Sequence, residues 1–210
     1  MHTEDVLILA MTKMLSGICT AGLTHHRGPD GRLRWLRPVR AFGPVLPGDM
    51  MEESGRLIQC CDVVEFHVLK PRHDPPHVED WIVDFVHHRP RVLRRLGGDR
   101  RAAFFAKHAL PSADPMLRRK ACSLCLIKPD DVTARFTRDP YSGKYQARMQ
   151  VALPGCDDAD ANGRGYPVTD LKWRALGRAW LGEKGESLVL SSAAITERVG
   201  ATALYLTMGL

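Results

Sequence analysis

The sequence predicts a mainly β protein with some helix, in which two small β-barrels are joined by a helical segment. Three observations predict this fold class. Short strand-like runs separated by turns fill residues 1–86, a basic stretch with helical spacing follows over 87–119, and strand-like runs return over 120–210 with one helix near 170–181. Many short strands broken by turns favour small barrels over a sandwich. We therefore expect two barrel domains, 1–86 and 120–210, and a linker at 87–119.

The first predicted barrel begins with a buried strand, because Val6 to Leu9 form a continuous apolar run. Ser16-Gly17 interrupts the chain, and a Gly- and Pro-containing turn follows at 25–31. Basic and apolar residues alternate over 34–39, so one face of that strand is expected to be wet and basic. The five expected strands are 5–14, 19–23, 34–39, 62–69 and 81–83.

The linker is expected to hold two short helices within 89–109, joined at Gly97-Gly98, with Asp99 as the N-cap of the second. Beyond it the predicted elements belong to the second barrel. They are strands at 123–127, 132–137 and 145–153, a hairpin turn at 139–144, an exposed loop at 154–165, a helix from Asp170 to about Leu181 capped by Thr169, and closing strands at 187–190 and 202–208.

Composition excludes several classes of protein. With 44% apolar and 26% charged residues in 210, the chain can bury a core and does not resemble a disordered protein. It has no apolar run near the roughly 18 residues of a membrane helix and no signal-peptide pattern, so a cytoplasmic location is expected. The net charge is +6, and the basic residues are 22 Arg and 8 Lys. A GC-rich genome or a role in binding phosphate would each explain this excess of arginine.

Six cysteines are expected to be mostly reduced thiols, because a chain of this size without an export signal needs no disulfide framework. They are Cys19, Cys60, Cys61, Cys122, Cys125 and Cys156. Cys122 and Cys125 have the spacing of half a zinc site, but the second pair that a structural site needs is missing. Structural thiols are therefore the preferred interpretation, ahead of zinc binding and redox chemistry.

Nine histidines include the adjacent pairs His25-His26 and His87-His88. His73 and His77 are four residues apart, but Pro75-Pro76 forbids the helix that would align them on one metal. Solvated loop histidines are the preferred interpretation. No metal and no cofactor is predicted, and no catalytic residue is assigned, since the phosphate-loop, dinucleotide and nucleophile-elbow patterns are all missing.

Two basic clusters are better candidates for function. Residues 27–40 carry a charge of +4 around Trp35, and residues 89–101 carry +5. A basic groove with interleaved aromatic side chains holds single-stranded nucleic acid with little sequence preference. For each cluster the alternative is a solvated face that binds nothing, and an aromatic content of 7% argues against a long stacking platform.

Two segments near the start of the chain have a recognisable pattern. The run from Leu7 to Gly22 contains a Thr-Lys-x-x-Ser-Gly-x-Cys-like turn, and the Gly31–Val39 strand contains Arg-Trp-Leu-Arg-Pro. In these segments the chain resembles the bacterial dual OB-containing domain family. The resemblance continues through Asp62–Phe66 and Glu79–Trp81, and returns weakly at Tyr166–Trp173 and near the end of the chain. This sequence departs from the family pattern by one extra residue, Leu33, between Gly31-Arg32 and Arg34-Trp35. The resemblance implies two OB-like barrels, a fold that typically binds nucleic acid, nucleotides or oligosaccharides on one face.

We therefore predict a non-catalytic module that binds nucleic acid, single-stranded more readily than double-stranded, or a nucleotide. The predicted binding residues are Lys13, Ser16, Gly17, Arg34, Trp35, Arg37 and Arg40. The alternative is a protein-interaction subunit that docks a partner through the helical linker, with Arg94, Arg95, Arg100 and Arg101 as contacts beside Phe104 and Phe105. A metal-dependent enzyme that uses Cys122 and Cys125 is a third, weaker hypothesis.

Overall fold

A computed structural model describes residues 2–14, 16–153 and 163–210. The chain divides into two compact units, each described here by itself. Unit 1 comprises residues 1–108, 115–125 and 209–210, and unit 2 comprises 109–114 and 126–208. The described residues include no helix with the length and apolar character needed to cross a membrane.

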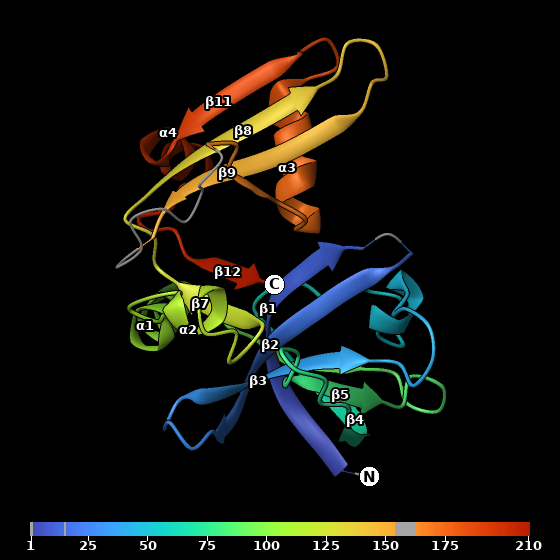
Figure 1. The fold of residues 1–210 in the computed structure, drawn as a ribbon. Helices are drawn as coiled ribbons and strands as arrows, with labels where there is room; N and C mark the ends of the chain where they lie inside the picture. Colours follow the sequence, from blue (N-terminus) through green and yellow to red (C-terminus); the bar gives the residue numbers. More distant parts are fainter. Residues whose placement is uncertain (1, 15, 154–162) are drawn as a thin grey trace. The chain divides into compact units, whose positions relative to one another are not determined.

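Unit 1 is built on a closed ring of five strands (Figure 1). The ring order is β1-β2-β3-β5-β4, and it closes because β1 pairs with β4 as well as with β2. All ring pairs are antiparallel except β3 with β5, which is parallel. This is a five-stranded barrel of the OB kind, as the sequence predicts. The strands are β1 (His2–Lys13), β2 (Ile18–Arg27), β3 (Leu33–Val39), β4 (Asp62–Pro71) and β5 (Asp80–Val83).

The long strand β1 closes the barrel by serving two neighbours. Residues 2–7 pair with β4 and residues 6–13 pair with β2, with a shift of register between Ile8 and Ala10. Such an irregularity bends a strand and increases its twist, which lets one strand lie in two parts of a small barrel. The buried side chains at the barrel's centre include Val6, Ile8, Leu36, Val64, Phe66 and Val68.

Three further elements belong to unit 1. The 3-10 helix η1 (Pro47–Met50) follows β3, strand β6 (Arg91–Arg95) adds to the outer edge of β4, and α1 (Gly98–His108) follows β6. A short helix, α2 (Asp114–Leu117), and β7 (Leu124–Ile127) come next in the chain, and β7 pairs with β12 (Leu206–Gly209) in a two-stranded sheet.

Unit 2 is a four-stranded antiparallel sheet of order β10-β9-β8-β11. Its helix α3 packs on the sheet, and the core contains Val132, Phe136, Met149, Leu190 and Ile195. The chain as a whole is therefore mainly β with α, as predicted. The elements of unit 2 are β8 (Asp131–Arg138), β9 (Tyr145–Ala152), β10 (Tyr166–Pro167), α3 (Leu171–Leu181), β11 (Ser187–Ser191) and α4 (Ser192–Val199).

The structure corrects three predictions of secondary structure. Residues 91–95 form β6 rather than a helix, because the open edge of β4 offers backbone hydrogen bonds to an extended segment. Asp99 lies in the first turn of α1, which begins at Gly98, so it is not the cap. In α3 the N-cap is Asp170 instead of Thr169, and its carboxylate accepts the backbone N–H of Trp173 at 2.7 Å.

Other local predictions are confirmed or fall outside the described residues. The hairpin turn at 139–144 joins β8 to β9, and α3 ends at Leu181 as predicted. Helix α4 was not predicted from the sequence. Most of the predicted loop at 154–165, including Cys156, lies outside the described residues.

Candidate functional site

The usual ligand face of an OB barrel is formed by strands β2 and β3 and by the loops L12, between β1 and β2, and L45, between β4 and β5. In unit 1 this face is not open along β2. All residues from Ile18 to Thr24 are buried except Cys19, which is half-buried. Since successive side chains of a strand point to opposite faces, both faces of this part of β2 are covered.

Arg37, a predicted phosphate contact on the neighbouring strand β3, is largely buried. Its Nε lies 2.5 Å from Oδ1 of Asp80, and the two side chains are only 16% and 12% exposed. Burial raises the pKa of the neighbouring Cys19 thiol. The hydrogen bond from Arg37 to Asp80 and their opposite charges more than offset the burial of Arg37, so the pKa of its guanidinium is raised. Arg37 is therefore already neutralised by an internal partner.

Arg40 is also committed to an internal contact. Its guanidinium donates to both oxygens of Asp49, at 2.8 and 2.5 Å. The same carboxylate accepts the backbone N–H of Leu46 at 2.7 Å, which fixes the start of η1. This fork-to-carboxylate pair ties the end of β3 to the following loop.

Loop L12 keeps the predicted side chains accessible. Lys13 and Ser16 are exposed, and no ion pair to Lys13 occurs among the described residues. The backbone N–H of Met14 donates to the Gly17 carbonyl at 2.9 Å and closes the turn. A Cβ at Gly17 would lie 2.3 Å from the carbonyl oxygen of Val45, so this position requires glycine for close backbone approach.

Loop L45 adds a basic residue that the sequence analysis missed. Arg72 is exposed, and its Nη1 donates to the carbonyl of Arg40 at 3.3 Å. That contact places the start of L45 beside the end of β3. In the sequence Arg72 lies outside both basic clusters, and its neighbours give no signal of its position.

Arg34 and Trp35 lie at the other end of β2. The carbonyl of Arg34 accepts the Thr24 hydroxyl, and Trp35 pairs with Leu23. Thr24 is six residues from the start of β2, which corresponds to roughly 20 Å of strand. Arg34 is exposed and Trp35 is half-buried. The structure therefore separates the predicted set into two exposed groups, with Lys13 and Ser16 at one end of β2 and Arg34 at the other.

A segment after α2 contributes a buried polar contact to unit 1. Ser123, fully buried, donates its hydroxyl to Oε1 of Glu79, which is 3% exposed. Burial raises the pKa of Glu79 and also that of the Cys122 thiol. Protonated thiols are poor nucleophiles and poor metal ligands. Among the described residues, no third ligand atom forms a metal-sized cluster with Cys122 and Cys125.

The second basic cluster is divided between β6 and α1. Arg95 donates to Oδ1 of the fully buried Asp62 at 3.1 Å, so it holds β6 to β4. Arg94, Arg100 and Arg101 are exposed. Helix α1 has no buried residue, and its Phe104 and Phe105 are half-buried.

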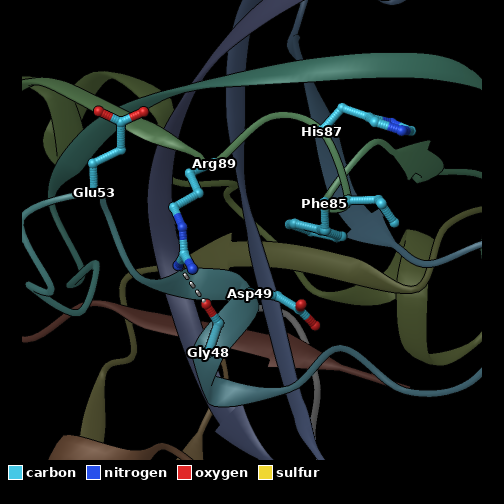
Figure 2. A pocket seen from close by; sticks show the side chains of 7 residues that line it. Gly48, Asp49, Glu53, Phe85, His87 and Arg89 are labelled. Carbon is cyan, nitrogen blue, oxygen red and sulfur yellow. Dashed lines mark hydrogen bonds between the residues drawn. The ribbon is translucent and has the colours of Figure 1, made fainter.

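A separate polar pocket of about 460 Å³ lies beside η1 (Figure 2). Its lining includes Asp49, Glu53, His87 and Arg89, and the Arg89 side chain reaches the Gly48 carbonyl at 3.5 Å. Charges of both signs line it, and Asp49 is already bound by Arg40. None of the predicted phosphate-binding residues lines this pocket.

Comparisons with known proteins bear on the family. No curated protein and no solved structure matches the chain significantly. A family model described as the dual OB-containing domain matches residues 4–175. That match covers most of the chain, including four strands of the barrel completely and β1 from Glu4 onward. The chain therefore belongs to the dual OB-containing domain family.

Proposed function

We propose that unit 1 is a non-catalytic module that binds single-stranded nucleic acid or a nucleotide, with its first contacts at L12. The observation that carries the proposal is that some basic side chains of this OB barrel are ion-paired and others are exposed. Arg37 and Arg40 are ion-paired inside the fold, whereas Lys13 on L12 and Arg72 on L45 are exposed. The proposal includes the cytoplasmic location that the sequence predicts.

The chemistry of L12 suits a phosphate. The Lys13 ammonium supplies charge, and the Ser16 hydroxyl supplies a neutral donor on the same turn. The two internal ion pairs fix the supporting loop without competing for the ligand. Arg34 lies at the far end of β2, roughly 20 Å from L12, so only a ligand longer than a mononucleotide would contact both. An OB fold engages about 4–16 nucleotides, which spans that distance.

Binding of a labelled single-stranded oligonucleotide at two salt concentrations tests the proposal. The variant Lys13→Glu/Arg72→Glu is expected to bind at least about 10-fold more weakly than the wild type. Its salt dependence should be shallower by roughly 1.4, because each lost phosphate contact on a single strand removes about 0.7 from the slope.

The matched control is Lys144→Glu/Lys184→Glu, which makes the same change of charge at two exposed lysines of unit 2. It should bind as the wild type does. Equal weakening in both double variants would mean that only net charge matters. Binding without salt dependence, or none at low salt, would contradict the proposal.

A protein partner on α1 is the second candidate, favoured by the helix having no buried residue while it carries Phe104 and Phe105. The variant Arg94→Glu/Arg100→Glu, added to the same titration, separates the two. It leaves Arg95 in place because that side chain holds Asp62. Unchanged oligonucleotide binding leaves α1 free for a protein, whereas weakened binding makes the second basic cluster, on β6 and α1, part of the nucleic-acid site.

A further inference from the structure

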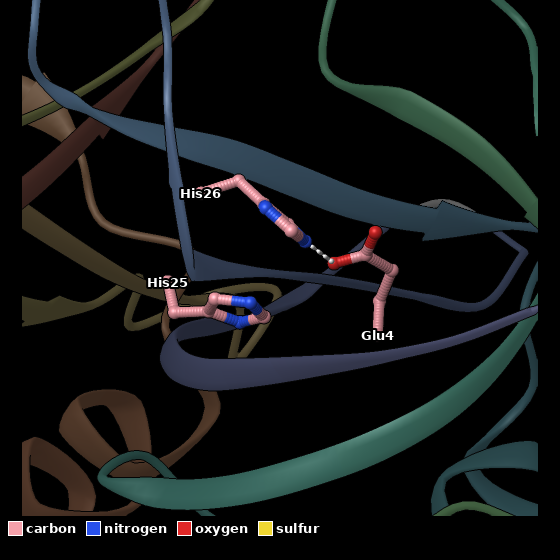
Figure 3. A group of neighbouring side chains, drawn as sticks. All are labelled: Glu4, His25 and His26. Atoms are coloured by element: carbon pink, nitrogen blue, oxygen red, sulfur yellow. Dashed lines mark ion pairs between the residues drawn. The ribbon is translucent and has the colours of Figure 1, made fainter.

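Two adjacent histidines and one buried glutamate converge at the opposite end of β1 from L12 (Figure 3). Glu4 lies on β1, and His25 and His26 lie near the end of β2. One ligand atom from each residue lies within 4.8 Å of the others. Figure 3 shows both imidazole rings directed toward the Glu4 carboxylate.

A local irregularity of β2 places both histidines on one side. Consecutive residues of a regular strand point to opposite faces. Between Leu23 and Arg27 the register with β3 shifts, and β2 carries more residues than its partner over this stretch. The His26 N–H donates to the Thr24 hydroxyl at 3.3 Å, a local contact within the irregular stretch. The rings of His25 and His26 consequently lie only 3.9 Å apart, centroid to centroid.

The Glu4 carboxylate is buried and incompletely satisfied. Its side chain is 6% exposed, and Oε2 accepts no hydrogen bond of full geometry; Nε2 of His26, 3.3 Å away, forms an ion pair with it only when that ring is protonated. The other oxygen, Oε1, lies 3.1 Å from Nε2 of His2. A buried charged oxygen without a full hydrogen bond is costly, and a cation held between it and the imidazoles would remove that cost.

A second His-His-carboxylate group in unit 1 shows what a satisfied version looks like. Asp84 lies beside His87 and His88, but its oxygens accept the backbone N–H groups of Val86 and His87 as well as both rings. These hydrogen bonds lower the pKa of Asp84. Asp84 therefore accepts two backbone N–H groups on Oδ1 as well as the histidine rings, whereas Oε2 of Glu4 has only Nε2 of His26, 3.3 Å away.

We propose that Glu4, His25 and His26 bind a divalent transition metal of the Zn²⁺ type, a site independent of the nucleic-acid proposal. Two imidazoles and one carboxylate form a usual ligand set for Zn²⁺. Tetrahedral ligands about 2.1 Å from zinc lie about 3.4 Å apart. His26 and Glu4 already have this separation, at 3.3 Å, and ligand atoms within 4.8 Å of one another need to approach by at most about 1.4 Å. Rotation of the exposed His25 ring supplies that movement. His2, on the other carboxylate oxygen, fixes the orientation of Glu4.

Equilibrium titration of the full chain with Zn²⁺ alone tests the proposal. The wild type is expected to bind one Zn²⁺ that His25→Ala/His26→Ala does not bind at the same concentrations. The affinity loss should exceed the 10–100-fold that removal of an outer-shell partner typically costs. Zn²⁺ should also raise the thermal midpoint of the wild type and leave that of the double variant unchanged.

The control His87→Ala/His88→Ala removes an equal pair of adjacent histidines beside a carboxylate and should keep the site. Glu4→Gln is a third variant, expected to fold because its amide fits the same space, and to lose Zn²⁺ affinity. Cysteine ligation would appear with Co²⁺ as a thiolate charge-transfer band, which the proposal excludes. Equal Zn²⁺ affinity in the wild type and in His25→Ala/His26→Ala would overturn it.

Discussion

The two units of the molecule place their arginines against different partners. In unit 1 the arginines form ion pairs with carboxylates, for example Arg37 with Asp80 and Arg40 with Asp49. In unit 2 five of the described arginines bind backbone carbonyls or lie over aromatic rings. Those contacts are Arg138 to Gly182 and Glu183, Arg148 to Arg164 and Gly165, Arg174 to Val168 and Tyr145, Arg178 to Tyr145, and Arg198 to Trp180.

The difference follows from how each unit uses its acidic residues. In unit 2 Asp139 and Asp170 accept backbone N–H groups of a turn and of a helix start, so they serve local structure. In unit 1 Asp62 and Asp80 lie on barrel strands, where a buried carboxylate requires a cation. The arginines of unit 1 therefore stabilise long-range strand pairing. Those of unit 2 stabilise local loops and aromatic packing.

The largest effect is expected from Phe136→Ala in unit 2. Phe136 is fully buried, with ring centroids 5.6 Å from Trp173 and 6.0 Å from Trp180. The cavity and the lost contacts should lower the free energy of unfolding by about 3–5 kcal/mol. Urea unfolding followed by tryptophan fluorescence measures it. Tyr141→Ala, at a side chain 98% exposed, is the control and should be nearly neutral. A loss below about 1 kcal/mol would show that aromatic packing does not hold unit 2.

Asp62→Asn should have a smaller but clear effect in unit 1. The fully buried carboxylate accepts from Arg56 and Arg95, both at 3.1 Å, and from the Gln59 N–H at 3.0 Å. Because both arginines are over 40% exposed, they rehydrate when the charge is removed. We expect a loss of about 2–4 kcal/mol by urea unfolding. Asp30→Asn, in an exposed pair with Arg32 at 3.9 Å, should cost far less. Equal losses in the two variants would contradict the distinction.

The smallest effect is expected from Glu79→Gln, and it should depend on pH. Burial raises the pKa of Glu79 in the folded state, so its favourable contribution is present below the unfolded pKa and is lost as pH rises through the folded value. The amide keeps an acceptor for the Ser123 hydroxyl. Glu79→Gln should therefore be more stable than the wild type at pH 8, with the gain disappearing toward pH 4. Thermal unfolding across that range checks this, and a gain largest at pH 4 would reverse the assigned sign.

Local sequence signals were sufficient where the structure is local. The apolar run at Val6–Leu9 predicted β1, and the Asp-Pro-Tyr-Ser-Gly turn predicted the β8–β9 hairpin. They failed at residues 91–95, where a helix was predicted and β6 is found. The basic pattern there suits a solvated helix as well as an edge strand, and the partner that decides is β4, about 30 residues away.

The same limit applies to the candidate site. The sequence identified Arg34, Arg37 and Arg40 as one basic strand, but could not show that Asp80 and Asp49 neutralise two of them. Arg72 was missed because its position beside β3 depends on a loop that returns from β4.

By itself, the sequence determined the mainly β class, a small barrel and the positions of most strands, because alternation and turn residues act over a few neighbours. The OB-like topology was implied by the resemblance to the family. Only the tertiary structure decided which charged side chains are exposed and which are paired. It also brought Glu4 to His25 and His26, 21 and 22 residues further along the chain. Strand pairing and a local shift of register create that proximity, and neither is encoded in the spacing of those three residues.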